Sequence, residues 1–147
     1  MKILTIYYSY TGVCKKAAED ISKKRNTSLY EVKDKKRPAT VAAYTIGCLK
    51  ALLGKSSPIE AVTEDLSQYD RIVIAGPVWA GNAAPSVNSI IDLLPADMKV
   101  EVIMISGSGT SKGKDKMTAR IKKRNSTLVR YKDIKATTIV PKQKKGK

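Results

Sequence analysis

Apolar, β-rich segments alternate with helix-patterned segments along this chain of 147 residues, and this alternation restricts the fold more than any other feature. Strand patterns are predicted at residues 3–8, 28–32, 71–75 and 100–105, and residues 128–140 are predicted to contain a fifth strand that can be interrupted. Helix patterns are predicted at residues 13–24, 39–53, 85–94 and 114–124. Because parallel strands need crossover connections, the pattern favours an α/β fold with a five-stranded parallel sheet covered by helices on both faces.

Length and composition indicate one domain with a strongly basic end. The hydrophobic content of 42% is sufficient for a core, and we expect one domain over residues 1–140. Residues 112–147 carry 14 Lys and Arg against 2 Asp and Glu, and the lysine-rich tail at residues 141–147 is predicted to be disordered. No apolar run is long enough for a membrane span and no signal-peptide pattern is present, so the predicted location is the cytoplasm.

The chain contains no histidine and two cysteines, Cys14 and Cys48, which are not in a CxxC spacing. A zinc site is therefore not expected, and we predict no metal ligands. The absence of histidine removes the commonest general base, so no catalytic residue is predicted. Two reduced thiols are favoured over a disulfide in a cytoplasmic protein.

Three loops that are rich in small residues each follow a predicted strand, and in a parallel sheet all three reach the same carboxyl edge. The first loop offers hydroxyls and a glycine at the start of a helix, a combination that suits a phosphate. Its residues are Ser9, Tyr10, Thr11, Gly12, Val13 and Cys14. The alternative interpretation is that Thr11 only caps the helix.

The second loop follows Gly76 and Pro77, which are predicted to end a buried strand. It contains Pro77, Val78, Trp79, Ala80, Gly81 and Asn82. Trp79 is the only tryptophan, and a large flat side chain on a loop is suited to stack on a planar ring. The alternative is that Trp79 folds back over the edge of the sheet.

The third loop, at residues 106–113, follows another buried strand. Its candidate residues are Ser106, Gly107, Ser108, Gly109 and Gly113. Their backbone amides could donate to the polar edge of a ring system, although a flexible connection has the same composition. The three loops together indicate a binding site more strongly than any one of them.

The first loop, Ile6-Tyr7-Tyr8-Ser9-Tyr10-Thr11-Gly12-Val13-Cys14 with Ala18 in register, resembles the phosphate signature of the flavodoxin family. The GPVWAG and SGSG segments resemble the two flavin-contacting loops of that family. The resemblance covers residues 1 to about 135. It implies a three-layer fold with strand order 2-1-3-4-5, FMN bound by the three loops, and electron transfer as the function. It also places the Gly81 region near flavin N5.

The chain departs from the family pattern in three respects. Cys14 occupies a position where the family usually has a threonine, and a thiol is a weaker donor to phosphate. The last helix of the fold is predicted to be missing, which would expose an apolar sheet face unless a partner, a homodimer or the C-terminal tail covers it. Flavodoxins are typically acidic, so the basic charge of this chain predicts an acidic redox partner.

Two other functions are compatible with the sequence. One is a small NAD(P)H-dependent flavin or quinone reductase, although no nicotinamide site is specified. The other is a flavodoxin-fold module that has lost FMN and binds an acidic partner or nucleic acid through its basic end. Nucleic acid is the less favoured partner because Tyr131 is the only aromatic residue in that region.

Overall fold

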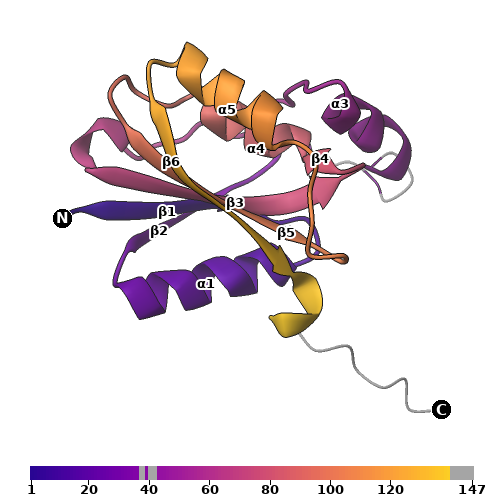
Figure 1. The fold of residues 1–147 in the computed structure, drawn as a ribbon, viewed down its shortest axis with the longest axis horizontal. Coiled ribbons are helices and arrows are strands. Elements are labelled where there is room, and N and C mark those ends of the chain that lie inside the picture. Colours follow the sequence, from indigo (N-terminus) through magenta and orange to yellow (C-terminus); the bar gives the residue numbers. More distant parts are fainter. Residues whose placement is uncertain (37–38, 40–42, 140–147) are drawn as a thin grey trace.

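The computed structural model describes residues 1–36, 39 and 43–139. Its centre is a sheet of five parallel strands (Figure 1). The strands are β1 (Ile3–Tyr8), β2 (Ser28–Val32), β3 (Arg71–Trp79), β5 (Lys99–Ser106) and β6 (Thr127–Lys135). Their spatial order is β2-β1-β3-β5-β6, which is the predicted order of five strands, and the short β4 (Asn82–Ala83) pairs antiparallel with the end of β3. No helix among the described residues is long and apolar enough to cross a membrane.

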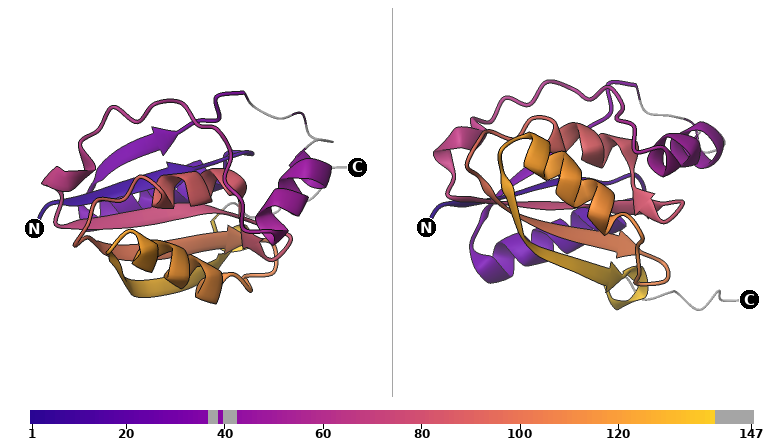
Figure 2. Two further views of the ribbon diagram at one scale, coloured as in Figure 1. Left: turned by 90° about the horizontal axis from the view of Figure 1, so that it is seen from above. Right: turned by 45° about the horizontal axis from the view of Figure 1, so that its top comes forward.

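Helices cover both faces of the sheet. Helix α1 (Val13–Arg25) lies on one face, and α4 (Pro85–Ile91) and α5 (Lys114–Lys123) lie on the other (Figures 1 and 2). The predicted helix at residues 39–53 is described as a π-helical turn, η1 (Ala43–Gly47), and α3 (Cys48–Leu52); residues 40–42 lie outside the described part. Short 3₁₀ turns, η2 (Leu66–Gln68) and η3 (Ala136–Thr138), complete the elements.

The prediction that β3 ends before Gly76 and Pro77 is wrong, because the strand continues to Trp79. Pro77 is tolerated because β1 pairs with β3 only as far as Ala75, so the missing N–H lies beyond that neighbour. Gly76 serves the packing of a helix instead. A Cβ atom at Gly76 would lie 2.3 Å from Cγ2 of Val87 on α4, so a side chain there would displace the helix.

The two sheet faces build separate cores. The core under α4 and α5 is the larger and is mainly aliphatic, with Ile72, Ile74, Ile90 and Met104 among its members. The core under α1 is smaller and contains smaller side chains. Its buried members are Tyr7, Cys14, Ala17, Ala18, Val73, Ala75, Ile103 and Ile105.

Among the described residues, only the 3₁₀ turn η3 follows β6, in agreement with the predicted absence of a last helix. Strand β6 ends at Lys135, so the stretch 128–140 contains most of a strand, as predicted, and the predicted tail at residues 141–147 lies outside the described residues. The prediction that this absence leaves a bare apolar face is wrong. Ile103 and Ile105 are buried beneath α1 and η3, and the neighbouring position is the buried carboxylate of Glu101.

Three arginines surround Glu101 on that face. Arg25 of α1 donates to both carboxylate oxygens, with Nη2–Oε2 and Nη1–Oε1 distances of 2.7 and 3.1 Å. Arg71 and Arg130 approach from β3 and β6, at 3.3 and 3.8 Å. At this end of the face a charged cluster therefore stands in place of the expected apolar surface. The half-buried side chains of Ile21 and Ile134 remain between α1 and β6, and the predicted homodimer stays a prediction.

Candidate cofactor site

The first loop leaves the start of α1 open toward the carboxyl edge of the sheet. The helix begins after Gly12, whose φ of 100° is left-handed, and no side chain caps its first N–H groups. Thr11 is exposed and does not act as the predicted cap. Ser9 stabilises the turn instead, because its Oγ accepts a hydrogen bond from the Gly12 N–H at 3.0 Å. Uncapped N–H groups at the start of a thirteen-residue helix favour an anion.

Trp79 lies at the end of β3 rather than on a free loop. Val78 and Trp79 pair with Ala83 and Asn82, so Ala80 and Gly81 form a two-residue hairpin turn. Both have positive φ, 51° and 79°, as a type I′ turn requires. The Gly81 carbonyl accepts a hydrogen bond from the Lys112 N–H at 2.7 Å, so it is already engaged with the third loop.

The indole of Trp79 is held by two aromatic contacts. The rings of Tyr10 and Tyr8 meet it edge to face, with centroid separations of 5.7 and 6.3 Å. The Tyr8 hydroxyl donates to Asp34 at 2.5 Å, which fixes that ring in turn. Trp79 is half-buried and packs against the core under α4 and α5.

The third loop is tied to itself and to β6. The Ser106 Oγ accepts from the Gly109 N–H at 2.9 Å, and the Ser111 hydroxyl donates to Asp133 at 2.7 Å. Gly109, with φ of 78°, packs against Lys135, which directs this part of the loop toward the end of β6. The bonds make the loop a defined structure rather than a flexible connection.

The ends of β1, β3 and β5 enclose a cleft of about 580 Å³, within the range of roughly 300–1,000 Å³ that is typical of cofactor sites. Ten predicted site residues line it: Tyr10, Thr11, Val13, Cys14, Pro77, Val78, Trp79, Ala80, Ser106 and Gly107. None of the described residues that line the cleft is charged, so its polar groups are hydroxyls, two thiols, the indole N–H and the backbone.

Seven predicted residues are not part of the cleft lining. Ser9 and Gly12 form the turn beneath it, Gly81 bonds to the third loop, and Gly109 packs against β6. Ser108 bonds to Thr110 within its own loop. Asn82 and Gly113 line a separate groove between α3, α4 and α5.

Three cleft residues were not predicted: Cys48, Ile105 and Ala136. The rule that ligands lie at carboxyl ends of strands identifies Ile105 and Ala136, since they stand at the ends of β5 and β6. Cys48 comes from α3, and no pattern in the sequence places that helix beside the cleft.

Cys14 lies at the junction between the cleft and the core under α1. Burial raises the pKa of its thiol to about 12, so the side chain is neutral at physiological pH. The side chain packs with Ala17 and Ala18, and both cysteines are free thiols, as predicted. A neutral, largely buried thiol offers little to an anion, for which backbone N–H groups at a helix start are better suited.

Comparison with solved structures relates this fold to flavin-binding proteins. A flavoprotein from Lactobacillus acidophilus, crystallised in complex with FMN, has a TM-score of 0.75 and 25% identity, with 88% of this chain and 91% of that chain covered. Oxidised flavodoxin 2 from Bacillus cereus has a TM-score of 0.54 and 16% identity, with 98% and 88% covered. An archaeal flavodoxin has a TM-score of 0.57 and 12% identity, with 92% and 85% covered.

No protein among those with a curated function matches the sequence. A family model described as Flavodoxin matches residues 2–142, which is nearly the whole chain. The order of the strands, the position of the cleft and this match agree with one another, and the protein belongs to the flavodoxin family.

Proposed function

We propose that the chain binds FMN without a covalent bond in the cleft and carries electrons between partner proteins. The observation that supports this most directly is the meeting of an uncapped helix start and the Trp79 wall in one cleft. The first feature suits a phosphate and the second a planar ring. The FMN complex of the L. acidophilus protein, which shares this fold, supports the same ligand.

At the phosphate end, the first N–H groups of α1 donate to the anion, and the hydroxyls of Ser9 and Thr11 add to them. Ser9 already accepts from the Gly12 N–H, which leaves its own proton available for donation. A Cβ at Gly12 would meet no atom within 4 Å, so the space above this turn is open to a ligand.

At the ring end, Trp79 and Tyr10 form an apolar wall beside Pro77 and Val78. Because Tyr8 and Tyr10 both pack edge to face against Trp79, the indole is held as one wall of the cleft, and a wall of fixed orientation favours binding of a flat ring. Bound FMN would supply the one- and two-electron chemistry. The protein's own residues orient the cofactor and exclude water from one side of it.

The proposal is tested by titrating the flavin-free protein with FMN and with riboflavin, which lacks the phosphate. FMN fluorescence should be quenched on binding, with a dissociation constant of about 1 μM or lower. The double variant Ser9→Ala/Thr11→Ala should weaken FMN about tenfold while leaving riboflavin affinity unchanged. Trp79→Ala should weaken both ligands to a similar extent.

Val129→Ser is the control, because this side chain is exposed on β6 and does not line the cleft. FMN that remains fully fluorescent in excess protein would contradict the proposal. Equal weakening of FMN and riboflavin by the Ser9 and Thr11 changes would place the phosphate elsewhere.

A carrier and a reductase differ in one further measurement. The flavin-loaded carrier should not oxidise NADH or NADPH by itself, whereas the reductase alternative requires that it does. We propose a cytoplasmic protein that exchanges electrons with an acidic partner. The free thiols of Cys14 and Cys48 and the net charge of +15 support these two proposals.

A further inference from the structure

The segment formed by η1 and α3 exposes its large apolar side chains and buries its small ones. Ile46, Leu49, Leu52 and Leu53, here named the leucine patch, are 51–59% exposed. Gly47 and Ala51 of the same segment are buried against the body of the protein. The patch accounts for four of the eight exposed large hydrophobic side chains among the described residues. A cluster of this kind marks an interaction site more often than isolated exposed leucines do.

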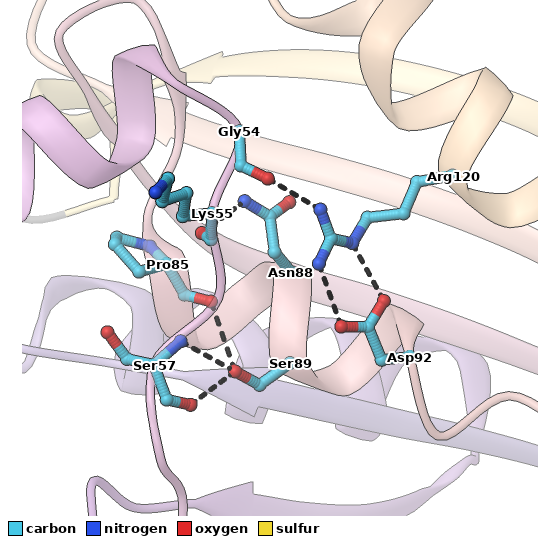
Figure 3. Close-up of polar contacts among 8 residues, drawn as sticks. All are labelled: Gly54, Lys55, Ser57, Pro85, Asn88, Ser89, Asp92 and Arg120. Atoms are coloured by element: carbon cyan, nitrogen blue, oxygen red, sulfur yellow. Dashed lines mark hydrogen bonds and ion pairs between the residues drawn. The ribbon is translucent and has the colours of Figure 1, made fainter.

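The position of the patch is fixed by hydrogen bonds from α4 and α5 to the backbone that follows α3 (Figure 3). Arg120 donates to the Gly54 carbonyl at 2.6 Å, and is itself oriented by two 2.8 Å bonds to Asp92. Asn88 donates to the Lys55 carbonyl at 3.0 Å. Lys116 donates to the Leu52 carbonyl at 2.9 Å. The leucines are therefore presented by an anchored helix end.

The leucine patch is continuous with a basic groove of about 580 Å³ between α3, α4 and α5. Ala51 and Leu53 line one side of the groove, and Lys116, Lys123 and Arg124 line the other. Asp92 also lines it, but its carboxylate is paired with Arg120. Lys50, on α3 itself, adds a further cation beside the leucines. Apolar contacts bordered by positive charge complement a partner surface in which carboxylates surround apolar side chains.

The surface adjoins the cofactor cleft. Cys48 lines the cleft and Leu49, the next residue, belongs to the patch. Asn82, which follows the Trp79 hairpin, lines the groove. A partner bound here would lie beside the proposed flavin, as electron transfer requires.

We propose that the leucine patch and the basic groove form the docking surface for an acidic partner protein. This inference rests on the proposed function for its purpose, although docking itself does not require bound FMN. A second copy of the chain is a poorer occupant, because the lysines around the patch would face one another in a protein of net charge +15. A lipid surface is also poorer, because it does not fill a groove lined by Asn82 and Asn88.

The test measures binding of cytochrome b5, an acidic haem protein, and cytochrome c, a basic one, with and without FMN at low ionic strength. We expect cytochrome b5 to bind more tightly in both states, with an affinity that falls as salt is added. Leu49→Ser/Leu53→Ser and Lys50→Glu/Lys123→Glu should each weaken it about tenfold, since truncated central contacts typically cost this much or more. Their FMN affinity should stay unchanged.

Two matched variants serve as controls. Leu29→Ser removes an exposed leucine on β2, and Lys23→Glu/Lys24→Glu makes the same change of charge on α1. Both should weaken cytochrome b5 by less than about twofold, as is typical of contacts outside an interface. Equal effects of patch and control variants would overturn the proposal, as would tighter binding of cytochrome c.

Two further measurements test the other possible occupants of the patch. Binding to phosphatidylglycerol vesicles tests a lipid surface, and sedimentation of the protein alone tests a second copy of the chain. Loss of vesicle binding in the leucine variant, with cytochrome b5 binding unchanged, would assign the patch to a membrane and overturn the proposal. A dimer that the leucine variant dissociates would assign it to a second copy, with the same consequence. Failure to bind FMN, with docking intact, would reject the proposed function but leave this surface in place.

Discussion

The two faces of the sheet are covered in different ways. Under α4 and α5 the strands present aliphatic side chains to two helices, and residues such as Ile72 and Ile90 are completely buried. Under α1 a single long helix covers β1 and β3, and the part of the sheet over β5 and β6 carries Glu101 with Arg25, Arg71 and Arg130. One face is closed by helices, whereas the other is closed partly by ion pairs.

The difference shows how a sheet can end without a covering helix. An apolar face beyond α1 would invite association with other chains. Here the three arginines, whose side chains are 28–58% exposed, place charge rather than apolar surface over this part of the sheet. Because two of the arginines come from β3 and β6 and the third from the end of α1, the cluster also connects α1 to that half of the sheet.

The largest expected effect concerns how tightly α1 closes its smaller core. Cys14 lies in that core with a pKa of about 12, whereas Cys48 is half-buried at the cleft. Only the thiolate reacts with Ellman's reagent, so Cys14 should react at least about a hundredfold more slowly than Cys48 at pH 8. Counting thiols with time, using Cys48→Ser to isolate Cys14, gives both rates. Rapid reaction of Cys14 would show that the face under α1 is loosely packed.

The next effect concerns the aliphatic face. Ile90→Ala should lower the free energy of unfolding by about 3–4 kcal/mol, because the side chain is fully buried and its removal leaves a cavity. Ile134→Ala, at a half-buried position on β6, should cost about 1–2 kcal/mol. Urea unfolding of both variants measures the difference. Equal costs would mean that the two faces are equally well closed.

The sequence predicts only part of the fold. Periodicity located all five parallel strands, and β1 and β2 have the predicted bounds, because alternating apolar runs depend on local pattern. The end of β3 was mistaken because Gly76 and Pro77 are strong breakers in isolation. Only the neighbours show that one meets Val87 closely and the other lies beyond the end of β1.

The candidate site was likewise predicted only in part from the sequence. The loop after β1 and the end of β3 supply most of the cleft, because the fold class places ligands at the carboxyl ends of these strands. The contribution of Cys48 depends on where α3 packs, which local pattern does not encode. The cluster at Glu101 was also missed, since its four members are spread from residue 25 to residue 130.

Removing the carboxylate of Glu101 should lower the stability of the protein more than removing one member of an exposed ion pair does. Glu101→Gln leaves three guanidinium groups around a neutral amide, and we expect a loss of about 2 kcal/mol in the free energy of unfolding. This is less than for Ile90→Ala because the arginines are partly exposed and solvent screens their repulsion. Urea unfolding at pH 7 measures it. A stability equal to that of the unmodified protein would mean that the cluster is dispensable.

The pH dependence of that loss has a definite sign. Hydrogen bonds from Arg25 lower the pKa of Glu101 below the ordinary value of 4.5. The folded state therefore binds its proton less readily than the unfolded state, and the stabilisation is complete above pH 4.5 and decreases below it. The stability difference between the unmodified protein and Glu101→Gln should narrow from pH 6 to pH 3. A stability difference that stays constant over this range would mean that the arginines do not stabilise the ionised form of Glu101.

The smallest effect distinguishes the arginines within the cluster. Arg130 is 58% exposed and 3.8 Å from the carboxylate, so Arg130→Ala should cost less than about 0.5 kcal/mol. Arg25 makes two hydrogen bonds to the buried Glu101, and Arg25→Ala should cost about 1–2 kcal/mol. Unfolding of the two variants at 50 mM and 500 mM salt compares them, with the smaller effect disappearing first as charges are screened. If Arg130→Ala lowers the free energy of unfolding as much as Arg25→Ala does, then the arginine on β6 stabilises this face as strongly as the one on α1. The difference between the two faces would then depend on β6 as well as on α1.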